Sequence, residues 1–286
     1  MITENMIKEA AAYINSHIQE KPEVAMILGS GLGELADEIE DAVFIPFEKV
    51  PHFPVSTVAG HKGQLVYGKL EGKMVLAMQG RFHYYEGYTM QEVTFPVRVM
   101  HDLGCEGMIV TNACGAMNQS FKPGDLMIID DHINFTGSNP LLGPNLDDYG
   151  PRFPDMSEVY TKELRSFAMD IGEQIGQEAD LKRGVYTAVS GPVYMAGAEL
   201  IMLRTCGADV VGMSTVPEAT VAKHMGMKVL GISCITDMAV GETIEGITHE
   251  EVIEVAAKAK PRFKALIRQI LADSEKSLWK KGGISS

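Results

Sequence analysis

The sequence predicts a single α/β domain built on a twisted mixed β-sheet that is flanked by helices on both faces. Short apolar runs of strand length alternate with longer segments of helical periodicity along most of the chain. This alternation is typical of a largely parallel or mixed sheet covered by helices. The 286 residues suffice for one large domain with a single core. We expect residues 1–273 to form that domain and the polar residues 274–286 to form a disordered C-terminal tail.

The expected helices and strands follow from the spacing of apolar residues. The spacing from Ile7 to Ile18 predicts an amphipathic first helix, and the apolar run 24–28 predicts a buried strand after it. Pro261 should kink the last helix or start a second one. Further strands are expected at 65–70, 74–78, 108–110, 126–129, 185–189, 210–211 and 229–235. Helical patterns occur at 90–103, 161–177, 195–206, 217–226 and 249–272.

The net charge and the lengths of the apolar segments limit the partners of this chain. The formal charge is −13, whereas a protein that binds nucleic acid over a broad surface needs clustered Lys and Arg. We therefore expect no nucleic-acid partner, and a local site would have to hold any anionic ligand. No apolar stretch approaches the ~20 residues of a membrane helix, so no membrane partner is expected.

The N-terminal residues and the cysteines indicate a cytoplasmic protein. Glu4, Lys8 and Glu9 interrupt the apolar residues of the first segment, which argues against a signal peptide. The cysteines show no CxxC spacing and no nearby His set at metal-ligand distance. We therefore expect no metal site and buried free thiols in a reducing compartment. The four cysteines are Cys105, Cys114, Cys206 and Cys234.

The segment 79–88, QGRFHYYEGY, carries the densest group of functional side chains. It follows the apolar run 74–78, and Gly80 breaks that run, so the polar side chains begin where a strand leads into a loop. Ligands of α/β sheets bind at such strand ends. Arg81 and Glu86 would alternatively be a surface ion pair and His83 a core histidine. We favour a binding site because all three side chains lie on one loop.

A glycine cluster, GSGLG at 29–33, follows the first strand and precedes a helical pattern. Its backbone N–H groups and the helix N-terminus are suited to an anion such as phosphate. Glu34 stands where a dinucleotide-binding fingerprint requires glycine, which argues against a nicotinamide-dependent oxidoreductase. A tight turn that only needs glycine for positive φ is the alternative, and Ser30 favours the anion site.

Three more polar groups occur at expected strand ends. TNACGAMN at 111–118 follows the strand 108–110, and a carboxylate, Asp237, ends the strand 229–235. In GMSTVPE at 212–218, Pro217 is suited to the start of a helix and Ser214 lies just ahead of it. Ser214 would alternatively be a helix cap, since small hydroxyls before helices usually are.

Together these motifs resemble the trimeric purine nucleoside phosphorylases, in the class that also contains methylthioadenosine phosphorylase. The resemblance runs from about Ile27 to His249. It implies a phosphorylase/hydrolase-like fold and a pentosyltransferase that converts a purine (deoxy)ribonucleoside and phosphate into free base and (deoxy)ribose 1-phosphate. Phosphate is then a co-substrate, and no metal or organic cofactor is implied. The motifs are ILGSGLG (27–33), GHKGQLVYG (60–68), QGRFHYYEGY (79–88), VTNACGA (110–116), DHIN (131–134), NPLLGPN (139–145), RFPDMS (152–157) and VGMSTVPE (211–218).

The resemblance also implies a role for individual residues. A dianionic nucleophile needs charge-assisted donors, and the departing purine needs relief of its developing negative charge. Phe153 matches an aromatic residue that a neighbouring subunit contributes, so a homotrimer is expected. The phosphate positions are Ser30, His61, Arg81, His83, Ala113 and Ser214. The sugar positions are Tyr85, Met213, His249 and Phe153. The base positions are Asn112, Tyr194, Met195 and Asp237. The catalytic candidates are His83, Asp237 and His249.

The base pocket departs from the family pattern at two positions. Enzymes for 6-oxopurines carry Glu in a GPxFET or GPxYET motif and Asn in an ITN motif, where this chain has Met195 and Asp237. Hypoxanthine and guanine present an N1–H donor and an O6 acceptor, which Glu and Asn match. Adenine inverts both edges, because its N1 accepts and its 6-amino group donates. The two changes therefore predict a 6-aminopurine nucleoside such as adenosine.

Other functions stay open from the sequence. The two departures would also fit a conventional inosine or guanosine phosphorylase in which Met195 only fills space. A methylthioadenosine phosphorylase is less favoured, because His249 is a polar neighbour for a 5′-methylthio group. From other classes, a nucleoside hydrolase would need no phosphate site, and a non-catalytic nucleoside-binding protein would bind without turnover.

Overall fold

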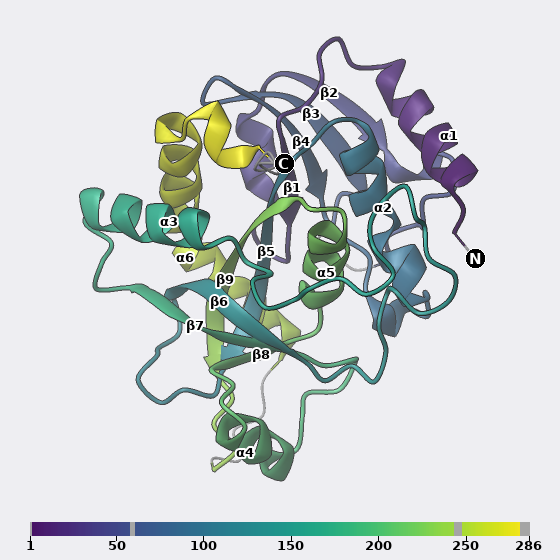
Figure 1. The fold of residues 1–286 in the computed structure, drawn as a ribbon. Coiled ribbons are helices and arrows are strands. Elements are labelled where there is room, and N and C mark those ends of the chain that lie inside the picture. The colour runs from purple at the N-terminus through teal and green to yellow at the C-terminus, as the bar shows by residue number, and fades with distance from the viewer. Residues whose placement is uncertain (1, 58–60, 243–247, 281–286) are drawn as a thin grey trace.

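The computed structural model describes residues 2–57, 61–242 and 248–280. Within these residues the chain forms one nine-stranded mixed sheet in the spatial order β2-β3-β4-β1-β5-β8-β7-β6-β9 (Figure 1). The strands are β1 (Val24–Leu28), β2 (Glu40–Pro46), β3 (Gln64–Leu70), β4 (Lys73–Gln79), β5 (Gly107–Ala116), β6 (Leu126–Asn134), β7 (Leu181–Ala188), β8 (Val210–Gly212) and β9 (Lys228–Met238).

The strand pairing brings the ends of four parallel strands together. Strand β1 pairs in parallel with β4 and with β5, and β5 pairs in parallel with β9. The loops that follow β1 and β4, and the C-terminal halves of β5 and β9, therefore lie at one edge of the sheet. Strand β9 also pairs antiparallel with β6. Because β6, β7 and β8 lead back to β5, these five strands close on themselves like a barrel.

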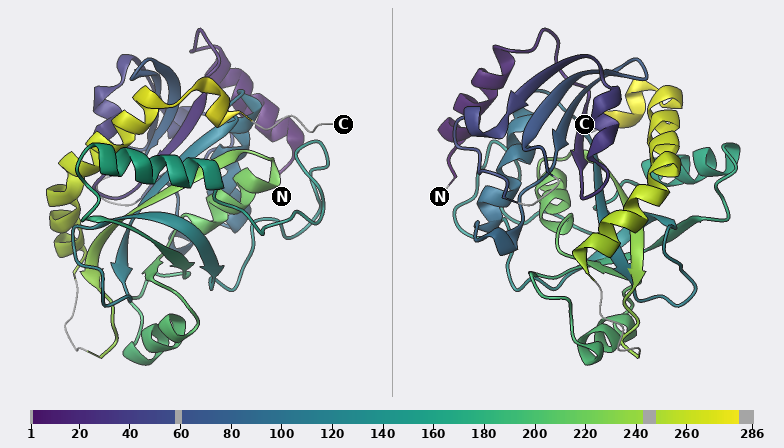
Figure 2. Two further views of the ribbon diagram at one scale, coloured as in Figure 1. Left: turned by 60° about the vertical axis from the view of Figure 1, so that its left-hand side comes forward. Right: turned by 180° about the vertical axis from the view of Figure 1, so that it is seen from behind.

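The helices cover both faces of the sheet, which confirms the predicted fold class (Figure 2). Helices α1, α2 and α5 bury apolar side chains in one core cluster, and α3 and α6 bury theirs in a second one. Helix α4 lies apart from the others, at one end of the molecule in Figures 1 and 2. The helices are α1 (Glu4–Asn15), α2 (Met90–Asp102), α3 (Lys162–Gln174), α4 (Gly197–Thr205), α5 (Val216–His224) and α6 (His249–Asp273).

The structure differs from the sequence-based expectations in several elements. Strand β2 was not expected, because it is an edge strand with a mostly exposed, irregular burial pattern. The helix after the glycine cluster is the short 3₁₀ helix η1 (Gly33–Glu38), not an α-helix. Helix α6 continues through Pro261, so no second helix starts there. Strand β5 extends to Ala116, so its polar residues lie inside the strand where they pair with β9.

The segment 274–280 also differs from the disordered tail expected over 274–286. Residues Lys276–Trp279 form the 3₁₀ helix η4, and the Trp279 side chain is 2% exposed. Its indole Nε1 donates to Ser274 Oγ at 2.7 Å. Gly107 leaves room for the ring, since a Cβ on it would lie 2.7 Å from Trp279 Cε3. The polar composition of the tail gave no signal for this apolar anchor, against whose cluster Leu278 also packs.

None of the helices in the described ranges has the length and apolar character needed to cross a membrane.

Candidate active site

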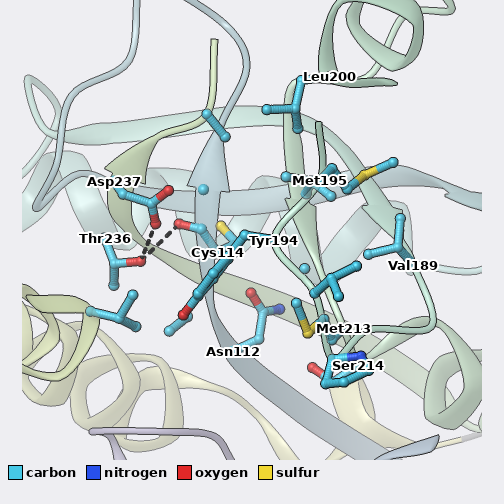
Figure 3. Close-up of a pocket in the computed structure, with 18 of the residues that line it drawn as sticks. Asn112, Cys114, Val189, Tyr194, Met195, Leu200, Met213, Ser214, Thr236 and Asp237 are labelled. Carbon is cyan, nitrogen blue, oxygen red and sulfur yellow. Dashed lines mark hydrogen bonds between the residues drawn. The ribbon is translucent and has the colours of Figure 1, made fainter. Parts of the chain in front are cut away.

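A cavity of about 710 Å³ lies at the edge of the sheet where the parallel strands end. Residues far apart in the chain line it, from the loop after β1 to the first turns of α6. It brings together eleven of the residues that the sequence analysis singled out, several of which are labelled in Figure 3. These are Ser30, Arg81, His83, Tyr85, Asn112, Ala113, Tyr194, Met195, Met213, Ser214 and Asp237.

Arg81 is the fixed cation of the cavity. Its Nη1 donates to the Thr111 carbonyl oxygen at 2.7 Å and to Ser214 Oγ at 2.9 Å. Its Nε lies 3.1 Å from Glu218 Oε1, and both side chains are almost completely buried. Nη2 is buried and has no hydrogen-bond partner among the described residues. One edge of a rigidly held guanidinium is thus left for a ligand with oxygen acceptors.

His83 is held in the same region by Glu86. Its Nδ1 lies 3.0 Å from Glu86 Oε1, and since a carboxylate only accepts, Nδ1 carries the proton. Although burial opposes it, hydrogen bonds from His83 and Thr57 lower the pKa of Glu86 to about 2. Burial lowers the pKa of His83, and the Glu86 hydrogen bond works against this change. His83 therefore keeps a defined tautomer and presents Nε2 to a ligand.

The His61 ring stacks on the His83 ring, and its Nε2 lies near the Ser30 hydroxyl. The two imidazole centroids are 5.5 Å apart, and His61 Nε2 is 3.4 Å from Ser30 Oγ. Burial and the nearby His83 and Arg81 lower the pKa of His61 to about 4. Gly80, at φ +114°, permits this approach, because a Cβ on it would lie 2.7 Å from His61 Cβ. His61 does not itself line the cavity but supports residues that do.

Ser214 is aimed by an unusual turn at the residue after it. Thr215 has φ +73° and ψ −53°, and the Val216 N–H donates to the Ser214 carbonyl oxygen at 2.8 Å. This is a γ-turn with a β-branched residue at positive φ, which is strained. Asn112 Nδ2 donates to Thr215 Oγ1 at 3.0 Å and supports the turn. Asn112, predicted to contact the base, thus lines the cavity but directs its amide N–H to Thr215.

The opposite end of the cavity combines apolar walls with one carboxylate. Asp237 Oδ1 lies 2.8 Å from the Thr236 hydroxyl, which is also 3.2 Å from the Cys114 carbonyl oxygen (Figure 3). Burial raises the pKa of Asp237, and the Thr236 hydrogen bond partly offsets this. Met195 packs against the apolar cluster that contains Leu200. Tyr194 is half exposed at the rim. A flat, largely apolar group with one polar edge fits this end.

Three predicted site residues are not among those that line the cavity, and His61, described above, is one of them. Phe153 is 88% exposed, and the Arg152 guanidinium lies over its ring, with Cζ 5.5 Å from the ring centroid. His249 is the first residue of α6, and its side chain lies outside what the structure describes. Val252, one turn further along α6, does line the cavity.

Three residues that organise the site received no individual role from the sequence, namely Thr111, Glu218 and Glu86, although Glu86 was placed on the candidate binding loop. The available signal for Glu218 was a lone carboxylate near the start of VPEATVAKH, a helix that is buried on nearly all sides. A buried carboxylate requires a cationic partner, and Arg81 is that partner. Thr111 offered no such signal, because its hydroxyl contacts depend on the pairing of β1 with β5 and its carbonyl contact depends on the position of Arg81.

The arrangement of the cavity favours a ligand with two different ends. Arg81, His83, Ser30 and Ser214 offer donors to an oxyanion, and Tyr194 with its apolar neighbours offers a surface for a planar ring. Across the residues that the structure describes, no three His, Cys, Asp or Glu side chains gather as a metal site would require. The cavity is thus built for an oxyanion beside an aromatic heterocycle.

Comparisons with known proteins agree with this geometry. Residues 23–272 match the model of the phosphorylase superfamily. The chain is 57% identical to purine nucleoside phosphorylase 1 of Bacillus subtilis over 269 residues, which are 94% of this chain and 98% of the relative. Crystal structures of Schistosoma mansoni purine nucleoside phosphorylase with adenosine (40% identity) and with inosine (38% identity) both superimpose with a TM-score of 0.91. Each covers 96% of this chain and 98% of the other.

Proposed function

The chain belongs to the phosphorylase superfamily and is a purine nucleoside phosphorylase, a pentosyltransferase, and we propose which residues bind each part of its substrates. Arg81, Ser30 and Ser214 bind the phosphate, together with His83 and the backbone N–H of Ala113, and His61 takes part through its contact with Ser30. The unpartnered Nη2 of Arg81 is the observation that carries this assignment. A buried guanidinium edge next to two hydroxyls is matched by phosphate oxygens in number and in charge.

The nucleoside lies with its sugar over the phosphate and its base toward Asp237. Tyr85 and Met213 contact the sugar, and His249 meets its 5′-hydroxyl. A phosphate oxygen forms a bond to C1′ while the bond from C1′ to N9 breaks, and the purine leaves with the electron pair. C1′ acquires oxocarbenium character in the transition state, which the phosphate charge beneath it stabilises.

The base end is proposed to prefer 6-aminopurines. The Asp237 carboxyl accepts from the 6-amino group, and its raised pKa favours a proton that it shares with N7 of the leaving base. Met195 replaces a carboxylate that would repel the lone pair on adenine N1, and Tyr194 stacks on the ring. Inosine is the competing substrate, since the Schistosoma mansoni relative has been solved with either nucleoside. The fold therefore does not decide the base, and the proposed preference rests on the Asp237 carboxyl.

The active form is proposed to be a cytoplasmic homotrimer. An aromatic side chain that is 88% exposed, like Phe153, is stabilised when a neighbouring subunit covers it. In a trimer Phe153 would complete the sugar site of the next subunit. The four cysteines are free thiols, which supports a reducing compartment, although Cys206 is exposed and not buried as the sequence predicted.

A substrate panel tests the proposal. The initial rates with adenosine, deoxyadenosine, inosine, guanosine and methylthioadenosine are measured with and without phosphate, and ribose 1-phosphate is quantified. We expect phosphate-dependent turnover with adenosine as the most efficient substrate. In Arg81→Ala the KM for phosphate should rise strongly while adenosine binding persists. Turnover without phosphate would indicate a hydrolase, and adenosine binding without any product would indicate a binding protein.

A further inference from the structure

Two glycines from distant segments lie backbone to backbone at the base end of the cavity. Both Gly197, the first residue of α4, and Gly241, beyond the end of β9, line the cavity. A Cβ on Gly197 would lie 2.4 Å from the carbonyl oxygen of Gly241, and one on Gly241 would lie 2.5 Å from that of Gly197. Any side chain at either position would therefore push the two backbones apart.

An ion pair between Arg204 and Glu242 also joins these two segments. Arg204, in the last turn of α4, donates from Nη1 to the Val240 carbonyl oxygen at 3.1 Å and to Glu242 Oε2 at 3.1 Å. Its Nη2 donates to the other Glu242 carboxylate oxygen. The helix buries Leu200 and Leu203 in a small apolar cluster with Val189, and it lies beside the end of β9 (Figures 1 and 2).

The two joined segments carry opposite walls of the base site. Tyr194 and Met195 immediately precede α4, whereas Asp237 lies four residues before Gly241. Strand β7 reaches only to Ala188, so no ladder hydrogen bond of the sheet fixes residues 191–196 against β9. Their separation therefore depends on contacts made by the side chains and on this glycine junction.

We propose that Gly197, Gly241 and Arg204 are positioning residues that set the distance between the Tyr194 wall and the Asp237 carboxyl. The junction thereby determines how tightly the base is held and which base is preferred. This inference rests on the proposed base-binding role of Asp237. The contact between the glycine backbones sets the closest approach, and the Arg204 ion pair holds the segments there.

The direct test is Gly197→Ala. Displacing one wall by the width of a methyl group should raise the KM for adenosine about ten- to hundredfold. The KM for phosphate should stay within about twofold, because Arg81 and Ser214 lie on other elements. The matched control is Gly172→Ala in α3, where a Cβ would lie 2.3 Å from Leu181 Cδ2, far from the cavity. It should lower thermal stability and leave both KM values unchanged.

A second, milder variant tests the junction even if Gly197→Ala fails to fold. Arg204→Met removes the ion pair but keeps the aliphatic stem, and we expect about a threefold rise in the adenosine KM. The control is Arg183→Met, which removes the Asp130 ion pair of β7 and β6 and should change neither KM. A folded Gly197→Ala protein with an unchanged adenosine KM would overturn the inference.

Calorimetric binding of free adenine separates this inference from the proposed base site. Weaker adenine binding in both Asp237→Asn and Gly197→Ala supports both proposals. Weaker binding in Asp237→Asn alone overturns the proposed positioning role of the glycine junction and still supports the base-binding role of Asp237. Unchanged binding in both variants overturns both proposals.

Discussion

The Glu218 carboxylate lies 3.1 Å from Nε of Arg81, and both side chains are buried to about the same extent. The glutamate belongs to α5 and the arginine to the loop after β4, so the pair joins two elements beneath the proposed phosphate site. Before phosphate binds, Glu218 is the nearest anion that balances the buried guanidinium. Loss of one partner of a buried pair costs about 3–5 kcal/mol, because it leaves an uncompensated charge.

Glu218→Gln should therefore unfold more easily in phosphate-free buffer while keeping the shape of the site. Phosphate would then supply the missing negative charge, so it should raise the Tm of Glu218→Gln by more than it raises the wild-type Tm. Thermal unfolding with and without phosphate measures both effects. Glu254→Gln, which disrupts an exposed pair with Lys258, is the control. An equal phosphate response in Glu218→Gln and wild type would contradict the coupling.

Asp237→Asn should move the substrate preference from adenosine toward inosine. The amide can donate to O6 of hypoxanthine, whereas it no longer supplies an acidic proton for N7 of adenine. A mismatched buried edge costs about 1–3 kcal/mol, so the ratio of the two kcat/KM values should change about tenfold or more. The double variant Met195→Glu with Asp237→Asn should shift it further. An exposed substitution, Asp170→Asn, is the control, and an unaltered ratio would count against the base-edge argument.

Phe153→Ala and Arg81→Ala should complement each other if the protein is a trimer with shared sites. Each variant alone should have low activity. When they are mixed and reassembled, some sites pair an intact Arg81 with an intact Phe153 from the adjoining subunit, and activity should return. Sedimentation should show a mass three times the 31.2 kDa of the chain. No recovery in reassembled mixtures would place Phe153 outside the neighbouring site.

Acid should destabilise the protein in part through His61. Burial and the neighbouring His83 and Arg81 lower its pKa from 6.5 to about 4. Between these two pH values the unfolded chain binds more protons, so the free energy of unfolding falls as the pH falls. The full contribution is on the order of 3 kcal/mol, and solvent screening reduces it. In urea titrations without phosphate, His61→Gln should lose less stability than wild type between neutral and acid pH, and an identical loss would refute the assignment.

Trp279→Ala should destabilise the whole domain although the residue lies in the C-terminal segment. Its ring belongs to the buried cluster of α3 and α6, and removing a large buried aromatic side chain costs about 3–5 kcal/mol. Urea unfolding should show a lower midpoint. Lys276→Ala, in the same 3₁₀ helix but largely exposed, should cost about 0.5 kcal/mol or less. Equal stability of the two variants would show that the segment is dispensable.

The sequence by itself determined the fold class and most of the residues around the cavity. Alternating apolar periods are local signals, so they predicted eight of the strands and every α-helix that the described residues contain. Polar motifs that directly follow apolar runs predicted which side chains meet, because the carboxyl ends of parallel strands share one edge. Phe153 and His249 were named on family resemblance, and they stay predictions at the level of their side chains.

Only the tertiary structure decided how those side chains are held. The Glu218 pair with Arg81 joins residues 137 positions apart, and the contact of Gly197 with Gly241 joins two segments that share no pattern. The positive φ of Thr215 runs against its own backbone preference and persists because contacts such as the Asn112 hydrogen bond support it. The burial of Trp279 likewise depends on a groove that Gly107 leaves open. Such contacts form only after the strands have paired, so the local spacing of residues in the sequence cannot predict them.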